Sequence, residues 1–101
     1  MEKQIQTFKL MPDYQCFCLW EMGQNIYENT DPNKLPISQE LKRDLSAWEK
    51  KYDDTLDEEY PPDSGFKSEQ EEKQFKKDGE NLQKRLQQEL GDGFQVTLFL
   101  P

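Results

Sequence analysis

The chain contains no histidine and only two cysteines, which limits the chemistry that it can perform. Histidine is the commonest general base near neutral pH and a frequent metal ligand. Cys16 and Cys18 lie in the run CFCLW, where a strand would place them about 7 Å apart on one face, a poor spacing for a disulfide. The sequence therefore predicts no enzyme activity, no metal site and no cofactor, and it assigns both cysteines to core packing.

Sequence motifs for phosphate binding or nucleophilic catalysis are also missing. The chain has no glycine-rich phosphate loop, no GxSxG elbow and no dinucleotide fingerprint. No run of apolar residues approaches transmembrane length, and the first residues, MEKQIQTFKLM, lack the apolar centre of a signal peptide. We therefore expect a cytoplasmic protein with reduced thiols that does not contact a membrane.

Basic residues are scarce relative to acidic ones. Thirteen Lys and Arg face 21 Asp and Glu, which gives a net charge of −8. This charge disfavours direct binding to nucleic acid and favours either a cationic protein partner or solubility alone. Because only 33% of the 101 residues are hydrophobic, we expect one domain, residues 1–101, with one modest core.

Three segments have the composition of strands. Residues 4–10 and 14–22, separated by the turn at Pro12 and Asp13, predict a hairpin, and residues 94–101 alternate apolar and polar side chains. Between them, residues 23–37 predict a long connection whose anchors are Ile26, Tyr27 and Leu35.

Two amphipathic helices are predicted between these strands. Ser38 is a good N-cap for the first, and Ser68 with Glu71 forms a capping box for the second, which ends at Gly91-Asp92-Gly93. Gly79 lies on the apolar stripe of the second helix, which predicts close approach to the first helix or to the sheet. The two stripes contain Ile37, Leu41, Leu45, Trp48 and Tyr52, and Phe75, Gly79, Leu82, Leu86 and Leu90.

The order of these elements, ββααβ, predicts an α+β fold. We expect a small antiparallel sheet of three strands with an αα-hairpin packed on one face, and the strand order stays open.

The connection between the two helices is the strongest functional candidate in the chain. Residues 36–67 contain nine acidic and five basic residues, and none of the basic ones lies between Tyr52 and Phe66. The run does not follow the calcium-loop pattern, which needs alternating acids and a central glycine. The predicted partner-binding residues are Asp53, Asp54, Asp57, Glu58, Glu59, Tyr60 and Asp63. The alternative is a solvated turn, with the flanking aromatics Trp48, Tyr52 and Phe66 in the core.

The helical region also resembles a known group of proteins. The runs LPIS, QEL, KRDL and SAWEKKYDDTL, then SGF, EQE, QKRL and QQEL, span residues 35–91. They are similar to small acidic bacterial immunity proteins of contact-dependent growth inhibition and related polymorphic toxin systems. The resemblance implies tight one-to-one binding to a basic toxin, often a nuclease, whose active site is masked. The other hypothesis is an acidic nucleic-acid mimic or adaptor that binds a basic protein surface without a toxin.

Overall fold

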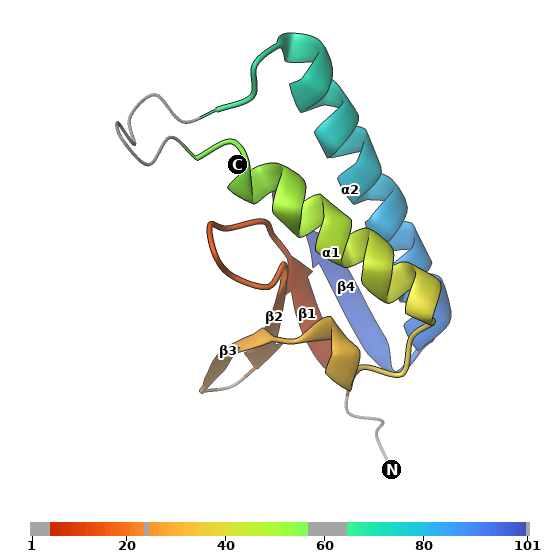
Figure 1. The fold of residues 1–101 in the computed structure, drawn as a ribbon. Coiled ribbons are helices and arrows are strands. Elements are labelled where there is room, and N and C mark those ends of the chain that lie inside the picture. Colours follow the sequence, from red (N-terminus) through yellow and green to blue (C-terminus); the bar gives the residue numbers. More distant parts are fainter. Residues whose placement is uncertain (1–4, 24, 57–64, 101) are drawn as a thin grey trace.

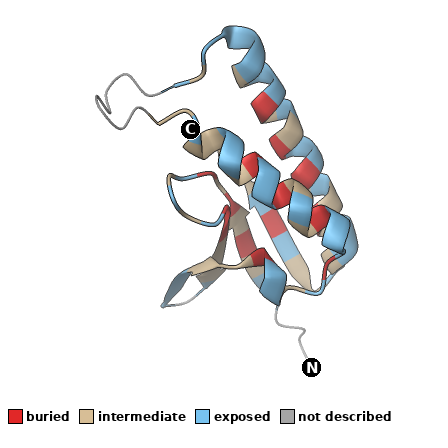
Figure 2. Cartoon of the chain, viewed as in Figure 1, coloured by how far each residue is buried: buried red, intermediate tan, exposed pale blue. Residues whose placement is uncertain are grey.

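The computed structural model describes residues 5–23, 25–56 and 65–100 (Figure 1). Its sheet has four strands in the order β3-β2-β1-β4. Both helices lie on one face of this sheet, and the buried residues lie between the two layers (Figure 2). In chain order the elements are β1 (Gln6–Leu10), β2 (Leu19–Gly23), β3 (Ile26–Thr30), the short 3-10 helix η1 (Pro32–Lys34), α1 (Gln39–Asp53), α2 (Glu69–Leu90) and β4 (Phe94–Leu98).

Both helices begin where their capping residues predict. The Ser38 hydroxyl accepts a hydrogen bond from the Leu41 N–H at 3.1 Å, and the Ser68 hydroxyl accepts one from the Glu71 N–H at 3.1 Å. These bonds satisfy N–H groups that the first turn of a helix leaves without partners. Helix α2 ends at Gly91, whose φ of 82° favours glycine.

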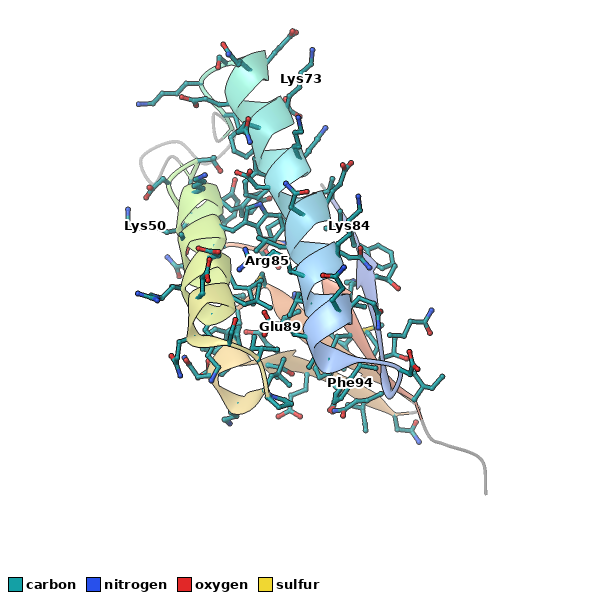
Figure 3. All side chains as sticks on the ribbon, turned by 90° about the vertical axis from the view of Figure 1, so that its right-hand side faces the viewer. Lys50, Lys73, Lys84, Arg85, Glu89 and Phe94 are labelled. Atoms are coloured by element: carbon teal, nitrogen blue, oxygen red, sulfur yellow. The ribbon has the colours of Figure 1, made fainter. Side chains whose placement is uncertain are left out.

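The helices pack closely around Gly79, as predicted. A Cβ atom at this position would lie 2.8 Å from Trp48 Cζ2 on α1 and 3.5 Å from a Leu98 methyl on β4. The Trp48 ring stacks on Phe75 with a centroid separation of 4.6 Å, and its Nε1–H donates to the Phe75 carbonyl. Figure 3 shows the two helices side by side, with Arg85 between them, where it pairs with Asp44 at 2.6 Å.

One hydrophobic core joins the helices to the sheet. Strands β1, β2 and β4 contribute to it, whereas β3 contributes none of its buried members. The buried residues are Phe8, Leu10, Cys18, Leu19, Ile37, Leu41, Leu45, Trp48, Phe75, Leu82, Leu86 and Val96. The predicted helix stripes and the inward face of the last strand are thereby confirmed, and Tyr52, Phe66 and Leu90 pack against the same cluster.

The α+β class is confirmed, but the prediction of three strands is wrong. Residues 26–30, expected to be part of a long connection, form β3, which pairs antiparallel with β2. The strand shows no alternation of buried and exposed side chains, because all of its side chains are exposed or half-buried. Ile26 and Tyr27 are 46% and 56% exposed, so they are not the anchors that we expected, whereas Leu35 does pack against the core.

The prediction of a wholly antiparallel sheet is also wrong. Strand β4 pairs parallel with β1, with Gln6 opposite Phe94 and Leu10 opposite Leu98. With β3 paired to β2, the sheet has free edges at β1 and at β3, and β4 takes the one at β1. The Gln6 N–H donates to the Gly93 carbonyl, so the chain enters β4 beside the start of β1 and runs in the same direction.

Residues 14–18 form a loop rather than the first half of a strand. Gln15 has a φ of 58°, in the left-handed region that interrupts extended backbone. Cys18 is buried at the end of this loop, as core packing predicts, whereas Cys16 is half-buried. The two cysteines therefore do not share one face of a strand.

Candidate functional site

Two of the predicted partner-binding residues lie at the C-terminal end of α1. Asp53 is half-buried, and Asp54 is exposed and pairs with Lys50 at 3.1 Å. The Lys50–Asp54 pair is solvated on both sides, so it contributes little to stability. The remaining predicted residues, Asp57, Glu58, Glu59, Tyr60 and Asp63, lie outside the described residues.

Asp53 has a structural partner in the loop of residues 13–18. Its Oδ1 accepts a hydrogen bond of 2.8 Å from the Gln15 N–H. A bond from a backbone N–H to a charged oxygen is stronger than one between neutral groups, so it helps to hold Gln15 at its positive φ. Asp53 therefore joins α1 to the 13–18 loop, a role that the sequence did not indicate.

Three further contacts tie the 13–18 loop to α1. The Tyr14 ring stacks on Tyr52 with centroids 4.6 Å apart, and its hydroxyl lies 3.2 Å from Thr55 Oγ1. At the other end of the loop, Glu49 Oε2 accepts from the Cys18 N–H at 2.9 Å. The loop and the end of α1 thus form one connected surface.

Carboxylates from separate parts of the chain act on Glu49 and on Cys16 at this surface, and we refer to them, together with Glu49, as the acidic cluster. Burial raises the pKa of Glu49; the Cys18 N–H partly offsets this, and the charges of Asp53 and Asp31 raise it further. Burial, then Asp13 and then Asp53, likewise raise the pKa of the Cys16 thiol. The acidic cluster is Asp13, Asp31, Glu49 and Asp53.

Only Asp53 of this cluster was among the predicted site residues. Asp13, Asp31 and Glu49 are far apart in the sequence; in the fold, the charge of Asp31 acts on Glu49 and that of Asp13 acts on Cys16. Asp31 N-caps η1 by accepting a hydrogen bond from the Asn33 N–H. In the sequence it therefore has the pattern of a capping residue and not of a binding residue. No spacing rule predicts such a tertiary cluster from one sequence.

A cleft of about 380 Å³ opens beside the end of α1 and the start of α2. Phe66 and Phe75 form its apolar wall, and their ring centroids lie 5.0 Å apart. Glu49, the carboxylate with a raised pKa, is not among the residues that line this cleft. Glu49 therefore lacks the setting typical of a catalytic carboxylate, which lies inside a pocket.

Metal and membrane signatures were also sought in the described ranges. Within residues 5–23, 25–56 and 65–100, no three His, Cys, Asp or Glu side chains are grouped in a way that could hold a metal ion. Neither α1 nor α2 has the length and apolar character needed to cross a membrane.

An acidic surface of this kind can attract a cationic partner, and comparison with known families gives the class of the protein. A family model described as Serratia CdiI immunity protein-like matches residues 6–100, and the chain belongs to this family. The match confirms the resemblance to immunity proteins of contact-dependent growth inhibition, and it covers the strands as well as the helical region that carried the resemblance. An immunity protein of this kind neutralises a cognate toxin. No curated protein matches the chain.

Proposed function

We propose that the chain neutralises a cationic toxin, a nuclease, by forming a one-to-one complex that covers the toxin's active site. The observation that carries this proposal is the concentration of carboxylates between Tyr52 and Phe66, in the sequence that ends α1 and follows it. The proposed contact residues are Asp53, Asp54, Asp57, Glu58, Glu59, Tyr60 and Asp63, together with Asp13 and Asp31.

The chemistry of a nuclease explains why carboxylates suit this task. Such an enzyme holds the phosphate backbone with Lys and Arg side chains, which are equally able to bind carboxylates. An acidic surface on the inhibitor also attracts the cationic toxin over several ångströms and speeds their encounter, an effect that salt weakens. Carboxylates seated on those Lys and Arg residues would exclude nucleic acid.

The contacts around the 13–18 loop support a preorganised surface. Asp53 is fixed by the Gln15 N–H and Glu49 by the Cys18 N–H. The Tyr14–Tyr52 stack holds the loop against the helix between them. Side chains that are already ordered lose less entropy when a partner binds, which favours affinity.

The other hypothesis, an acidic nucleic-acid mimic or adaptor without a toxin, uses the same charge. The family match favours immunity over this hypothesis. The position of the gene provides an independent check, because a toxin gene immediately upstream supports immunity and its absence counts against it.

The test is a binding measurement with the toxin domain encoded beside this gene, purified as a catalytically inactive variant. Reversal of Asp57, Glu58 and Glu59 to Lys is expected to slow association by about tenfold at low salt, and less at high salt. The matched control reverses three carboxylates on or after α2, Glu69, Glu80 and Asp92, and changes the net charge equally.

Stopped-flow association and calorimetry measure the two variants side by side. Equal effects of the two reversals would show that net charge alone matters and that the 53–63 segment is not the contact surface. Failure of the wild-type chain to bind the toxin domain would remove the proposed function altogether.

A further inference from the structure

The two edges of the sheet differ in whether their outward backbone groups are bonded by side chains. At the β4 edge, two glutamines of α2 bind the outward backbone groups of the strand. Gln83 Nε2 donates to the Val96 carbonyl at 2.8 Å, and Gln87 both donates to the Phe94 carbonyl at 2.7 Å and accepts from the Val96 N–H at 2.9 Å. Another strand cannot pair along this edge without displacing these side chains.

The β3 edge carries no such protection among the described residues. The Met11 N–H donates to the Cys18 carbonyl, so even-numbered residues of β2 bond to β1 and odd-numbered ones bond to β3. The odd-numbered Leu19, Glu21 and Gly23 pair with Thr30, Glu28 and Ile26. Tyr27 and Asn29 therefore direct their N–H and C=O groups away from the sheet, on a side where Figure 1 shows no other element.

The side chains along β3 add an unbalanced charge. Glu21 and Glu28 lie directly opposite one another on β2 and β3, where like charges destabilise a sheet. The Gln6 amide donates to Glu21 at 2.6 Å, whereas Glu28 is exposed and forms none of the salt bridges within the described residues. A cation placed beside Glu28 would relieve this repulsion.

The outer face beside β3 holds a rigid aromatic group. The Tyr27 ring is 56% exposed, stacks on Trp20 with centroids 5.3 Å apart, and its hydroxyl accepts from Lys9 Nζ at 3.3 Å. The ring is thus fixed in place before any partner arrives, with an apolar surface left open to the solvent. Exposed aromatic area of this kind is typical of strong protein contacts.

We infer that the β3 edge receives an extended strand of the cationic toxin, which continues the sheet through the backbone of Tyr27 and Asn29 and places a Lys or Arg beside Glu28. The added strand would lay an apolar side chain against Tyr27 on the outer face, since neighbouring strands bring side chains of one face together. This inference rests on the proposed function, because it takes the strand from the toxin.

A second copy of the chain fits this edge less well. Pairing of β3 with itself around Glu28 would add a further like-charge contact to the Glu21–Glu28 pair. It would also bring together two molecules that each have a net charge of −8. Charge therefore favours a basic partner over self-association.

The backbone contact can be tested at Tyr27, whose N–H makes no bond within the sheet. Tyr27→Pro removes this N–H at a position where an edge strand tolerates proline, and Tyr27→Ala removes the ring alone. If a toxin strand pairs here, Tyr27→Pro should bind the inactive toxin domain about tenfold more weakly than Tyr27→Ala. Circular dichroism melts establish that both variants are folded.

Hydrogen exchange of the full chain provides a second readout that does not depend on a variant. The amides of Tyr27 and Asn29 should exchange at least about tenfold more slowly in the toxin complex than in the free chain. Glu28→Lys should weaken binding, whereas its matched control Glu80→Lys on α2 should have a smaller effect.

The outcomes separate this inference from the proposed function. Toxin binding with unprotected Tyr27 and Asn29 amides, and equal affinities for the Pro and Ala variants, would overturn the strand inference and leave the proposed function standing. Protection of the same amides in a dimer without toxin would overturn it in favour of self-pairing. Absence of any toxin binding would overturn both.

Discussion

Gly79 is the residue at which the packing of the two helices leaves the least room. The Trp48 ring beside it is buried at 2% exposure, stacks on Phe75 and donates a hydrogen bond to the Phe75 carbonyl. Both contacts fix the position of the ring against Phe75. A side chain at position 79 must therefore displace a fixed group rather than the end of a flexible one.

We expect Gly79→Ala to lower the free energy of unfolding by about 1–3 kcal/mol, because the new Cβ would lie 2.8 Å from Trp48 Cζ2. This range is the net change, because the cost of the close contact exceeds the gain of about 1 kcal/mol that Ala brings to a helix interior. Urea unfolding measures the change. Gly93→Ala is the control, since a Cβ there meets nothing within 4 Å, and a stabilised Gly79→Ala variant would contradict the expectation.

Glu49 makes the stability of the chain depend on pH. Its raised pKa means that the folded chain holds this proton more tightly than the unfolded chain does. The group therefore favours folding at pH values below its unfolded pKa, and this contribution is lost as the pH rises through its folded pKa. Other carboxylates titrate in the same range, so only a difference between two variants isolates the effect.

Glu49→Gln keeps an oxygen that can accept from the Cys18 N–H but cannot ionise. We expect the free energy of unfolding of this variant, minus that of the wild type, to become more positive from about pH 4 to about pH 7. Urea titrations across this range provide the measurement. A difference that stays constant with pH would show that Glu49 has the same pKa in the folded and unfolded chains.

At the scale of the elements, α1 is held at its start by α2. Glu89 near the end of α2 accepts from the Ser38 N–H at 2.6 Å and from the Ser38 hydroxyl at 2.9 Å. The same hydroxyl caps α1 through Leu41. Ser68 caps α2 through Glu71.

Replacement of these two caps separates the helix-capping energy from the contact between helices. Ser68→Ala should cost about 1 kcal/mol of unfolding free energy, and Ser38→Ala should cost up to about 2 kcal/mol because Glu89 also loses a donor. Chemical denaturation of both variants tests the order. Equal costs would mean that the Glu89 contact adds nothing measurable to the cap.

The helices were predictable because their signals are local. Capping residues and apolar residues at steps of three and four are visible in the sequence, and the caps at Ser38 and Ser68 follow them. Strand β3 was missed because it buries none of its side chains and is defined by pairing with β2. The parallel pairing of β1 with β4 was missed because it depends on the edge and the direction in which the chain returns to the sheet after α2.

The candidate site likewise has one part that the sequence predicts and one part that it does not. The acidic connection was visible because its carboxylates are consecutive in the sequence. Asp13 comes to this surface through the folding of the 13–18 loop onto α1, which contacts such as Gln15–Asp53 and Tyr14–Tyr52 produce, and Asp31 comes to it through η1. Sequence patterns record local periodicity and composition, and they do not record contacts of this range.

At the scale of the whole molecule, the family match gives the class of partner, a toxin, and the net charge of −8 favours a cationic one. The net charge is a global property of the sequence, because it depends on composition and not on the order of the strands. It predicts the sign of the partner's surface without giving the geometry of the contact.

The pairing of β1 with β4 joins the first strand of the chain to the last one. During synthesis, Phe8 and Leu10 leave the ribosome well before Val96 and the other residues of β4 that complete their layer. An unfinished chain thus exposes the edge of β1, and the sheet closes only after translation has passed Leu98. Where neutralisation needs the finished sheet, the time taken to synthesise the chain from β1 to β4 is time during which an incoming toxin is unopposed.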